Sequence, residues 1–386
     1  MNPLARVSHQ SIAYGIETTP GTPPAVAFRS LRVTGQSLDQ GLGYRPASGW
    51  ALQVAEQVLV DQEPGGGIAY EVAFGAPDDL WLAQLRAAAW VTGTTFTASD
   101  ITLTSSGLSS VTTDFTTLGL AVGQYGRVGT YGTARIQAIR AHALTLDCLP
   151  LGWSAGASGT VHFVGADYLT NGTTATSFTL ERVHAEVGGG VFDFSGMRPD
   201  HTVIAMRAGR RVQGATVFKG LSATRNTASL STGAVLGPLG GEVMDAGASG
   251  GVVLYEAGVV TGMIQSAAFT LKSNLKAEKS AVSLGNAGFA DGEGQGLFQF
   301  DAVFATTAGT ALYDKYLAGT QTSLAALMRD SAGNAYVVSL PAVRLTACRV
   351  VATDLGREVR LRGAAHALVD SATGVMARID RIAAGR

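Results

Sequence analysis

The chain has little of several residues that mark common protein classes. It carries two cysteines, Cys148 and Cys348, in 386 residues, which is too few for the disulfide framework of a secreted scaffold. Charged residues make up 15% of the chain and the formal net charge is −1, whereas proteins that grip nucleic-acid phosphates need a surplus of lysine and arginine. The sequence has no uncharged apolar run near the ~18 residues that a membrane helix needs. A disulfide scaffold, a tight nucleic-acid binder and a membrane-spanning protein are therefore disfavoured.

Signals for catalysis are equally scarce. The six histidines show no H-x-x-x-H or H-E-x-x-H spacing, which is the usual pattern of a metal site on a helix. The triplets Gly65–Gly67 and Gly188–Gly190 neither open a helix nor precede Lys-Ser/Thr, so hairpin turns explain them better than a phosphate loop. No G-x-S-x-G nucleophile elbow is present. The sequence predicts no catalytic residue, no cofactor and no metal, and we expect a protein that is not an enzyme.

Glycine and alternating apolar residues are what the chain does have. It contains 50 glycines without a G-X-Y period, together with many short runs of the kind seen at 68–74, where Ile68, Tyr70, Val72 and Phe74 share one face. This period of two is typical of half-buried strands. Only 78–88 and 311–318 have the spacing of helices. The expected fold class is mainly β.

An internal duplication organises these elements. The segment GGIAYEVAF before the first helix resembles GLFQFDAVF before the second. Aligning Phe74 with Phe304 pairs Ile68 with Phe298, Tyr70 with Phe300 and Glu71 with Asp301, and a two-residue gap then places Leu80-Trp81 on Leu312-Tyr313 and Leu85 on Leu317.

In the second copy the next strands follow directly after the helix, whereas in the first copy the corresponding strands begin only at about residue 174. The intervening 92–173 is rich in Thr, Ser and Gly and has short strands, so we expect a small inserted β-barrel or sandwich. The expected division is an N-terminal arm (1–27), a discontinuous first domain (28–91 and 174–225), the inserted domain (92–173), a Gly-rich linker (226–258), a second domain (259–370) and a C-terminal arm (371–386).

A duplicated β fold without a catalytic constellation suits assembly better than catalysis. Two copies of one fold present similar strand edges, and exposed edges must be covered. Head-to-tail pairing of such edges closes a ring when the rotation allows it, and stacked rings make a tube.

Six segments of the chain, taken in their order and spacing, are similar to tail tube proteins (major tail proteins) of long-tailed, non-contractile bacteriophages. They are AYGIETTPGTPP (13–24), GGGIAYEVAFGAPDDLWLAQLRAA (65–88), LAVGQYGRVGTYGTARIQAI (120–139), VFDFSGMRPDHTVIAM (191–206), AAFTLKSNLKAEKSAVSLG (267–285) and 311–345. The resemblance implies tandem β-sandwich domains, each with a flanking helix, in a virion protein that is made in the host cytoplasm and stacks in rings around a DNA channel.

The resemblance also implies partners. Six tube domains usually make one ring, so two domains per chain imply three chains with pseudo-sixfold symmetry, and six chains are the alternative. Neighbours in the virion would be a tape measure protein and a tail terminator or distal tail protein. Viral DNA would pass through the lumen without specific binding.

Three groups of residues are site hypotheses. Glu71 and Asp301 are expected on the polar face of the duplicated strand, lining a channel in which acids avoid phosphate contacts; solvent or a subunit contact is the alternative. The long loops 41–57 and 277–291 carry apolar residues that suggest ring stacking, unless each loop folds back on its own domain. The loop candidates are Tyr44, Arg45, Trp50, Leu52, Val282, Leu284 and Phe289. The helix residues are expected to plug the sandwiches, with a subunit contact as the alternative; they are Leu80, Trp81, Leu85, Leu312, Tyr313 and Leu317.

A rival hypothesis is a baseplate or spike component, or a module that binds host-surface carbohydrate. It rests on aromatic residues of the inserted domain, such as Tyr125, Tyr131 and Trp153. Clustered aromatics in a small β domain are more often core.

Overall fold

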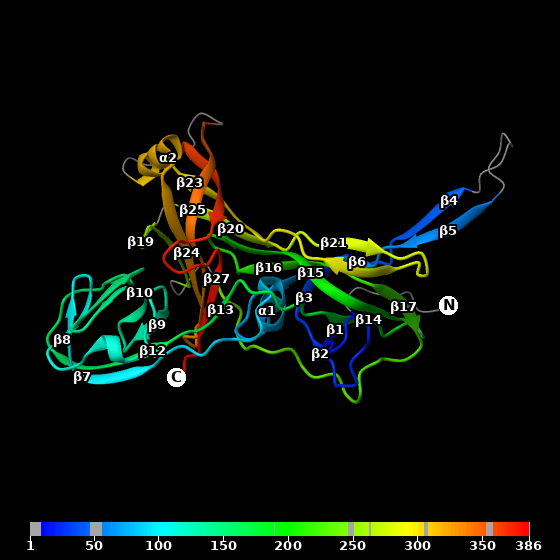
Figure 1. Ribbon diagram of the computed structural model, residues 1–386, viewed down its shortest axis with the longest axis horizontal. Coiled ribbons are helices and arrows are strands. Elements are labelled where there is room, and N and C mark those ends of the chain that lie inside the picture. Colours follow the sequence, from blue (N-terminus) through cyan, green and yellow to red (C-terminus); the bar gives the residue numbers. More distant parts are fainter. Residues whose placement is uncertain are drawn as a thin grey trace.

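The fold is mainly β, as the sequence predicts, and its strand ladders are antiparallel. The computed structural model describes residues 9–46, 56–188, 190–245, 251–261, 264–304, 308–352 and 358–385. Within these ranges the α-helices are α1 (Asp78–Leu85) and α2 (Ala308–Ala318). Figure 1 shows two β-rich halves at the centre, a small barrel at one end and a long hairpin leaving the opposite end.

The strands fall into three sets. Those of the first half are β1 (Gln10–Ile16), β2 (Arg29–Ser30), β3 (Val33–Gln36), β4 (Leu42–Pro46), β5 (Gln57–Gln62), β6 (Gly65–Glu71), β14 (Phe178–His184), β15 (Val191–Arg207), β16 (Gln213–Lys219) and β17 (Ser222–Asn226). Those of the second half are β18 (Val252–Glu256), β19 (Val259–Val260), β20 (Ile264–Lys272), β21 (Lys276–Lys279), β22 (Asn286–Ala290), β23 (Gln295–Val303), β24 (Gln321–Arg329), β25 (Ala335–Val351), β26 (Arg360–Leu368) and β27 (Arg378–Ile382). The inserted segment contributes β7 (Phe96–Thr104), β8 (Gly107–Ser110), a 3-10 turn (Phe115–Thr117), β9 (Tyr125–Val128), β10 (Gly132–Arg140), β11 (Ala143–Asp147), β12 (Gly159–Gly165) and β13 (Asp167–Thr170).

The two halves repeat one topology, element for element. Four strands pair in the order β3-β6-β16-β15 in the first half and β20-β23-β26-β25 in the second. A hairpin, β4–β5 or β21–β22, leaves between the first two of these strands along the chain. The pairs β1–β14 and β18–β24 also correspond, as do β15–β17 and β25–β27. The duplication expected from the sequence is visible in the strand pairing.

The ladder register corrects the sequence alignment by two residues. A bulge interrupts the β3–β6 ladder between Tyr70 and Ala69, and the same bulge interrupts β20–β23 between Ala302 and Asp301. Tyr70 therefore corresponds to Ala302, not to Phe300. Because side chains alternate with a period of two, this shift keeps every residue on its expected face. Glu71 and Asp301 thus share a face without occupying equivalent positions.

The two halves join into one sheet. β15 of the first half pairs with β20 of the second over seven residue pairs, from His201↔Lys272 to Arg207↔Ser266. The result is a continuous inner sheet of order β3-β6-β16-β15-β20-β23-β26-β25. The 17-residue strands β15 and β25 contribute their C-terminal halves to it. Their N-terminal halves pair with β14 and β24 in outer sheets that cover one face of the inner sheet.

Helix α1 seals the junction between the halves. Asp78 and Asp79 in its first turn complement the helix dipole, and the helix ends at Arg86 in the left-handed conformation. The ring of Trp81 is fully buried and lies 4.8 Å from the ring of Tyr336 in β25. Its indole N–H donates to the hydroxyl of Tyr70 at 3.1 Å. A helix of the first half therefore packs against the second half.

The inserted segment forms a closed six-stranded barrel of order β10-β11-β8-β7-β12-β9, with its own apolar core around Phe163 and Ile136. The barrel docks on the second half: Tyr125 and Cys148 share a buried cluster with Tyr255 of β18. β13, which follows the barrel, pairs with β27. The barrel therefore sits against the outer sheet of the second half.

Parts of the expected arms and linker are strands. β1 lies within the predicted N-terminal arm and pairs with β14. β27 lies within the predicted C-terminal arm and pairs with β25 and β13. β18, at the end of the predicted linker, pairs with β24. These segments add strands to the outer sheets, a long-range role that short sequence patterns do not reveal.

Candidate functional site

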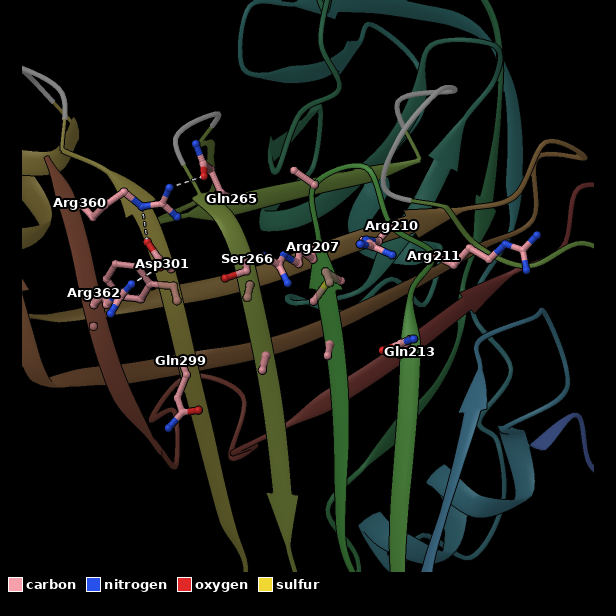
Figure 2. A pocket seen from close by; sticks show the side chains of 17 residues that line it. Arg207, Arg210, Arg211, Gln213, Gln265, Ser266, Gln299, Asp301, Arg360 and Arg362 are labelled. Carbon is pink, nitrogen blue, oxygen red and sulfur yellow. Dashed lines mark hydrogen bonds and ion pairs between the residues drawn. The ribbon is translucent and has the colours of Figure 1, made fainter. Parts of the chain in front are cut away.

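One face of the inner sheet is open and polar. The other face is core, with Ile68, Ile204, Phe269 and Phe298 each 1% exposed or less. On the open face, where β15 meets β20, lies a cleft of about 1000 Å³ lined by residues of both halves. Figure 2 shows Gln213 of β16, Ser266 of β20, and Gln299 and Asp301 of β23 on this face. A surface of this kind exists only because the two halves share one sheet.

Glu71 and Asp301 lie on this open side, and both are paired with arginines. The Nη1 of Arg211 lies 3.0 and 3.1 Å from the two carboxylate oxygens of Glu71. Arg360 and Arg362 donate through Nε to Asp301 at 2.7 and 3.1 Å (Figure 2). Burial alone would raise the pKa of Asp301, but the hydrogen bonds and charges of these arginines hold that pKa below its usual value. The acids are therefore neutralised locally.

Arginine dominates the cleft, which sequence reasoning missed. Its lining includes one acid, Asp301, and five arginines. All of these arginines except Arg360 are exposed, and Figure 2 shows Arg207 and Arg210 between Arg360 and Arg211. From sequence, Arg210-Arg211 and 357–362 are merely polar turns or solvated strand faces. The pairing of β15 with β20 brings these arginines together, and no short sequence pattern predicts that pairing. The cleft is thus more basic than the acid-lined wall expected from the sequence. The cleft lining is Ala205, Met206, Arg207, Ala208, Arg210, Arg211, Gln213, Gln265, Ser266, Ala267, Ala268, Gln299, Phe300, Asp301, Arg360, Arg362 and Gly363.

The hairpin β4–β5 protrudes and exposes apolar side chains. Tyr44 is 54% exposed, Val58 46% and Val60 44%, and Arg45 is exposed as well. Figure 1 shows this hairpin and β21–β22 extending toward the same side of the molecule. Trp50 and Leu52, the other candidates of this loop, lie outside the described residues.

The second hairpin is partly held against the first. Lys279 Nζ lies 2.5 Å from Asp61 Oδ1, and the carbonyl of Leu284 accepts from the backbone N–H of Gln62 at 2.8 Å. Val282 nevertheless remains 94% exposed and Leu284 47% exposed, whereas Phe289 is half-buried. The turn end of β21–β22 is therefore held against the base of β4–β5, while Tyr44, Val58 and Val282 keep exposed apolar surface.

The helix candidates differ between the halves. Leu80, Trp81 and Leu85 of α1 are buried. In α2, Leu312 is buried and Tyr313 half-buried, but Leu317 is 67% exposed, contrary to the expected core role.

The helix ends explain this difference. Both helices end at a left-handed residue, Arg86 or Gly319, whose N–H bonds to the carbonyl three residues back. This cap aligns Leu317 with Gln84 rather than Leu85. Gln84 is 4% exposed; its amide donates to Ser273 of the second half and accepts from Thr202 of the first. Leu317 has no corresponding cover within the described part of its own chain.

Two strand edges of the inner sheet are unpaired within the described ranges. β3 pairs with β6 on one side only, and β25 from Leu345 to Val351 pairs with β26 on one side only. Because β3 corresponds to β20 and β25 to β15, these are the two edges that meet inside the chain as the β15–β20 joint. The chain therefore contains one complete joint, between β15 and β20. The two edges of a second such joint, on β25 and β3, lie unpaired at opposite ends of the inner sheet.

Other kinds of site are not supported by the residues that the structure covers. Among them, no three His, Cys, Asp or Glu side chains gather as a metal site would require. None of their helices is long and apolar enough to cross a bilayer. In the barrel, Tyr125 is buried and the indole N–H of Trp153 donates to the carbonyl of Thr104, so both serve the packing; Tyr131 is 50% exposed.

Comparison with known proteins identifies the family. No curated protein matches the chain. A sequence profile described as phage tail tube protein matches residues 8–381, nearly the whole chain and both duplicated halves. With its mainly β fold and duplicated inner sheet, the chain belongs to the phage tail tube protein family.

Proposed function

We propose that the chain polymerises into rings that stack into the tail tube, the channel through which viral DNA leaves the particle. The observation that carries this proposal is the β15–β20 joint, which fuses two copies of one fold edge to edge and leaves the same two edges free at the ends of the inner sheet. If the free edge of one chain pairs with the other, unlike edge of the next chain, and each pairing adds the same rotation, the chains close into a ring. The repeating unit of that ring is one half of the chain, so each chain supplies two units.

The open face of the inner sheet lines the channel in this proposal. The opposite face is excluded because it is the apolar core. Glu71 and Asp301 belong to the wall, where they offset the charge of Arg211, Arg360 and Arg362 and so limit phosphate binding. DNA passes without sequence-specific contact.

The barrel lies on the outer surface of the tube, because it docks on the outer sheet of the second half. The hairpins β4–β5 and β21–β22 make the contacts between rings. They extend toward the same side of the molecule (Figure 1), as stacking along one axis requires, and their exposed apolar residues would be covered by the next ring.

Three chains with pseudo-sixfold symmetry complete a ring if the joint between chains repeats the joint within the chain; six chains are the alternative. The protein is made in the host cytoplasm and resides in the virion. A tape measure protein within the lumen, and terminator or distal tail proteins at the tube ends, are the partners proposed from family membership.

Negative-stain microscopy of the purified protein tests this function. Uniform rings or tubes with a central channel are the expected result. Closed small particles under all conditions would instead favour the rival, a baseplate, spike or carbohydrate-binding component. The buried state of Tyr125 and the bonded indole of Trp153 weigh against that rival.

A further inference from the structure

We propose that the C-terminal half of β25 in one chain pairs antiparallel with residues 37–39 of the next chain, which continue the edge of β3 along β6, in the register that β15 and β20 use within the chain. The partner is a second copy of this protein, and Arg349 of one copy lies opposite Asp39 of the other. The inference rests on the proposed function and adds the register and the residues that pair.

The internal joint fixes the register. Bulges in the β15–β16 and β25–β26 ladders align His201 with Ala347, so Ile204 corresponds to Val350. Bulges in β3–β6 and β20–β23 align Gly35 with Ser266, so Leu38 corresponds to Phe269. Ile204 pairs with Phe269. Transferred to the free edges, this register places Val350 opposite Leu38, Val351 opposite Ser37 and Arg349 opposite Asp39.

Apolar residues at the free edge are uncovered where their counterparts are buried. Ile204 is fully buried beside β20, whereas Val350 is 45% exposed. Leu317 of α2 is 67% exposed, whereas its counterpart Gln84 is 4% exposed. In the internal joint the second half supplies part of the cover over Gln84, through Ser273. The first half of the next chain would supply it for Val350 and Leu317, which gains apolar burial on assembly.

Charge is complementary across the proposed pair. Asp39 and Arg349 are both exposed in the single chain. Both lie on the open face, because their counterparts Thr270 and Val203 do so in the internal joint, where they form a cross-strand pair. Opposite charges directly across two strands stabilise the pairing, and like charges weaken it.

The free edge is capped in the single chain at Leu38, just beyond β3. Ser37 and Asp39 direct their N–H groups to β6, so the N–H and carbonyl of Leu38 face the unpaired side. The Leu38 N–H donates to Gln36 Oε1 at 2.8 Å, and its carbonyl accepts from Arg182 Nη1 at 2.7 Å. These side chains satisfy the groups that a neighbouring strand would otherwise bond. Pairing with β25 must displace them, which slows spontaneous association of free chains.

Disulfide trapping tests the register. In the double variant Ser37→Cys with Val351→Cys, the thiols face each other at a pair where antiparallel strands approach most closely. We expect mild oxidation to give linked species of up to three chains. The matched control, Ser37→Cys with Arg349→Cys, is two residues out of register and should stay unlinked, as should the parent, whose Cys148 and Cys348 are buried.

Charge reversal gives an independent readout. Asp39→Arg or Arg349→Asp alone should raise the concentration needed for assembly by about tenfold, and the two together should restore it. Failure of the double reversal to restore assembly would contradict the pair.

The outcomes separate the inference from the function on which it rests. Rings or tubes with an unlinked Ser37/Val351 pair, or with linkage in the shifted control, would overturn the proposed edges or register while the function stands. Absence of rings and tubes from the parent protein itself would overturn the function, and the inference with it.

Discussion

Trp81 of the first half packs its ring edge-to-face against Tyr336 of the second, with ring centroids 4.8 Å apart. Tyr336 donates its hydroxyl hydrogen to Asp78 at the start of the same helix, and Arg381 also bonds that carboxylate. The two copies of the fold are thus held by a buried polar and aromatic cluster as well as by strand pairing. One rigid chain with two repeating units is the structural basis for everything proposed above.

Truncating this cluster should loosen the two halves. Trp81→Ala removes a fully buried ring, and we expect the free energy of unfolding to fall by about 3–5 kcal/mol. Chemical denaturation followed by circular dichroism measures this. Trp153→Ala, in the barrel, is the control and should leave the contact between halves intact. A loss below about 1 kcal/mol for Trp81→Ala would show that α1 does not hold the joint.

Substitution by serine should lower stability at Ile204 but impair assembly at Val350, its counterpart in the second half. Ile204→Ser creates a polar cavity in the core and should lower stability by about 2–4 kcal/mol. Val350→Ser, at the exposed counterpart, should leave stability within about 0.5 kcal/mol but impair assembly. Thermal unfolding and sedimentation of both variants check this. Normal assembly of Val350→Ser would argue against burial of that edge.

The protruding hairpin should be needed for stacking but not for folding. Tyr44→Ser with Val58→Ser removes apolar surface that is exposed in the single chain. We expect normal stability and single rings without tubes, scored by electron microscopy. Val111→Ser, on the barrel, removes an 87% exposed apolar residue and serves as the matched control that should still form tubes. Tubes of normal length from the hairpin variant would remove its proposed role.

Neutralising Asp301 should make the open face retain DNA. Asp301→Asn frees Arg360 and Arg362 from their shared carboxylate. The protein should then bind a short DNA duplex more tightly at low salt, with a steeper salt dependence, because each added phosphate contact releases counterions. Gln299→Asn on the same face should change neither quantity. Unchanged binding by Asp301→Asn would indicate that this acid does not screen the arginines.

One buried carboxyl should make stability depend on pH. Burial, aided by the neighbouring Glu181 carboxylate, raises the pKa of Asp193 to about 6, although the Asn226 amide acts the other way. The folded state therefore keeps a proton that the unfolded state releases from about pH 4, and stability falls as pH rises from about 4 to 6. Asp193→Asn should be more stable than the parent by about 1–2 kcal/mol at pH 8 and equal to it at pH 4. Denaturant titrations at both pH values test this, and an equal gain at both would exclude the protonation effect.

The sequence predicts whether a segment is a helix or a strand better than it predicts which strands pair and in which register. The strand at 68–74, the two helices and the inserted β unit follow from local patterns; the structure contains the helices and the barrel, and the strand ends at Glu71. The alignment of Tyr70 with Phe300 is wrong by two residues because a shift of two preserves alternation. The register is set by bulges beside Gly35 and Ser266, where nothing in the local pattern marks an extra residue.

Long-range pairing accounts for what the sequence does not predict about the site. Arg207 and Arg360 lie more than 150 residues apart in the chain, and only the β15–β20 joint brings both to one cleft. Leu317 fits a helix core pattern, yet its cover is absent from the described chain. An apolar residue meant for a neighbouring copy has the same sequence signature as one meant for the core. Comparison of the two halves, position by position, is what distinguishes them.

The mass of an isolated ring, measured by native mass spectrometry, tests the central claim most directly. A ring of three chains, each of 39.6 kDa, should have a mass of about 119 kDa and a cross-section with six similar lobes. A ring of six chains, or an open assembly without closure, would contradict the account in which the joint between chains repeats the joint within them.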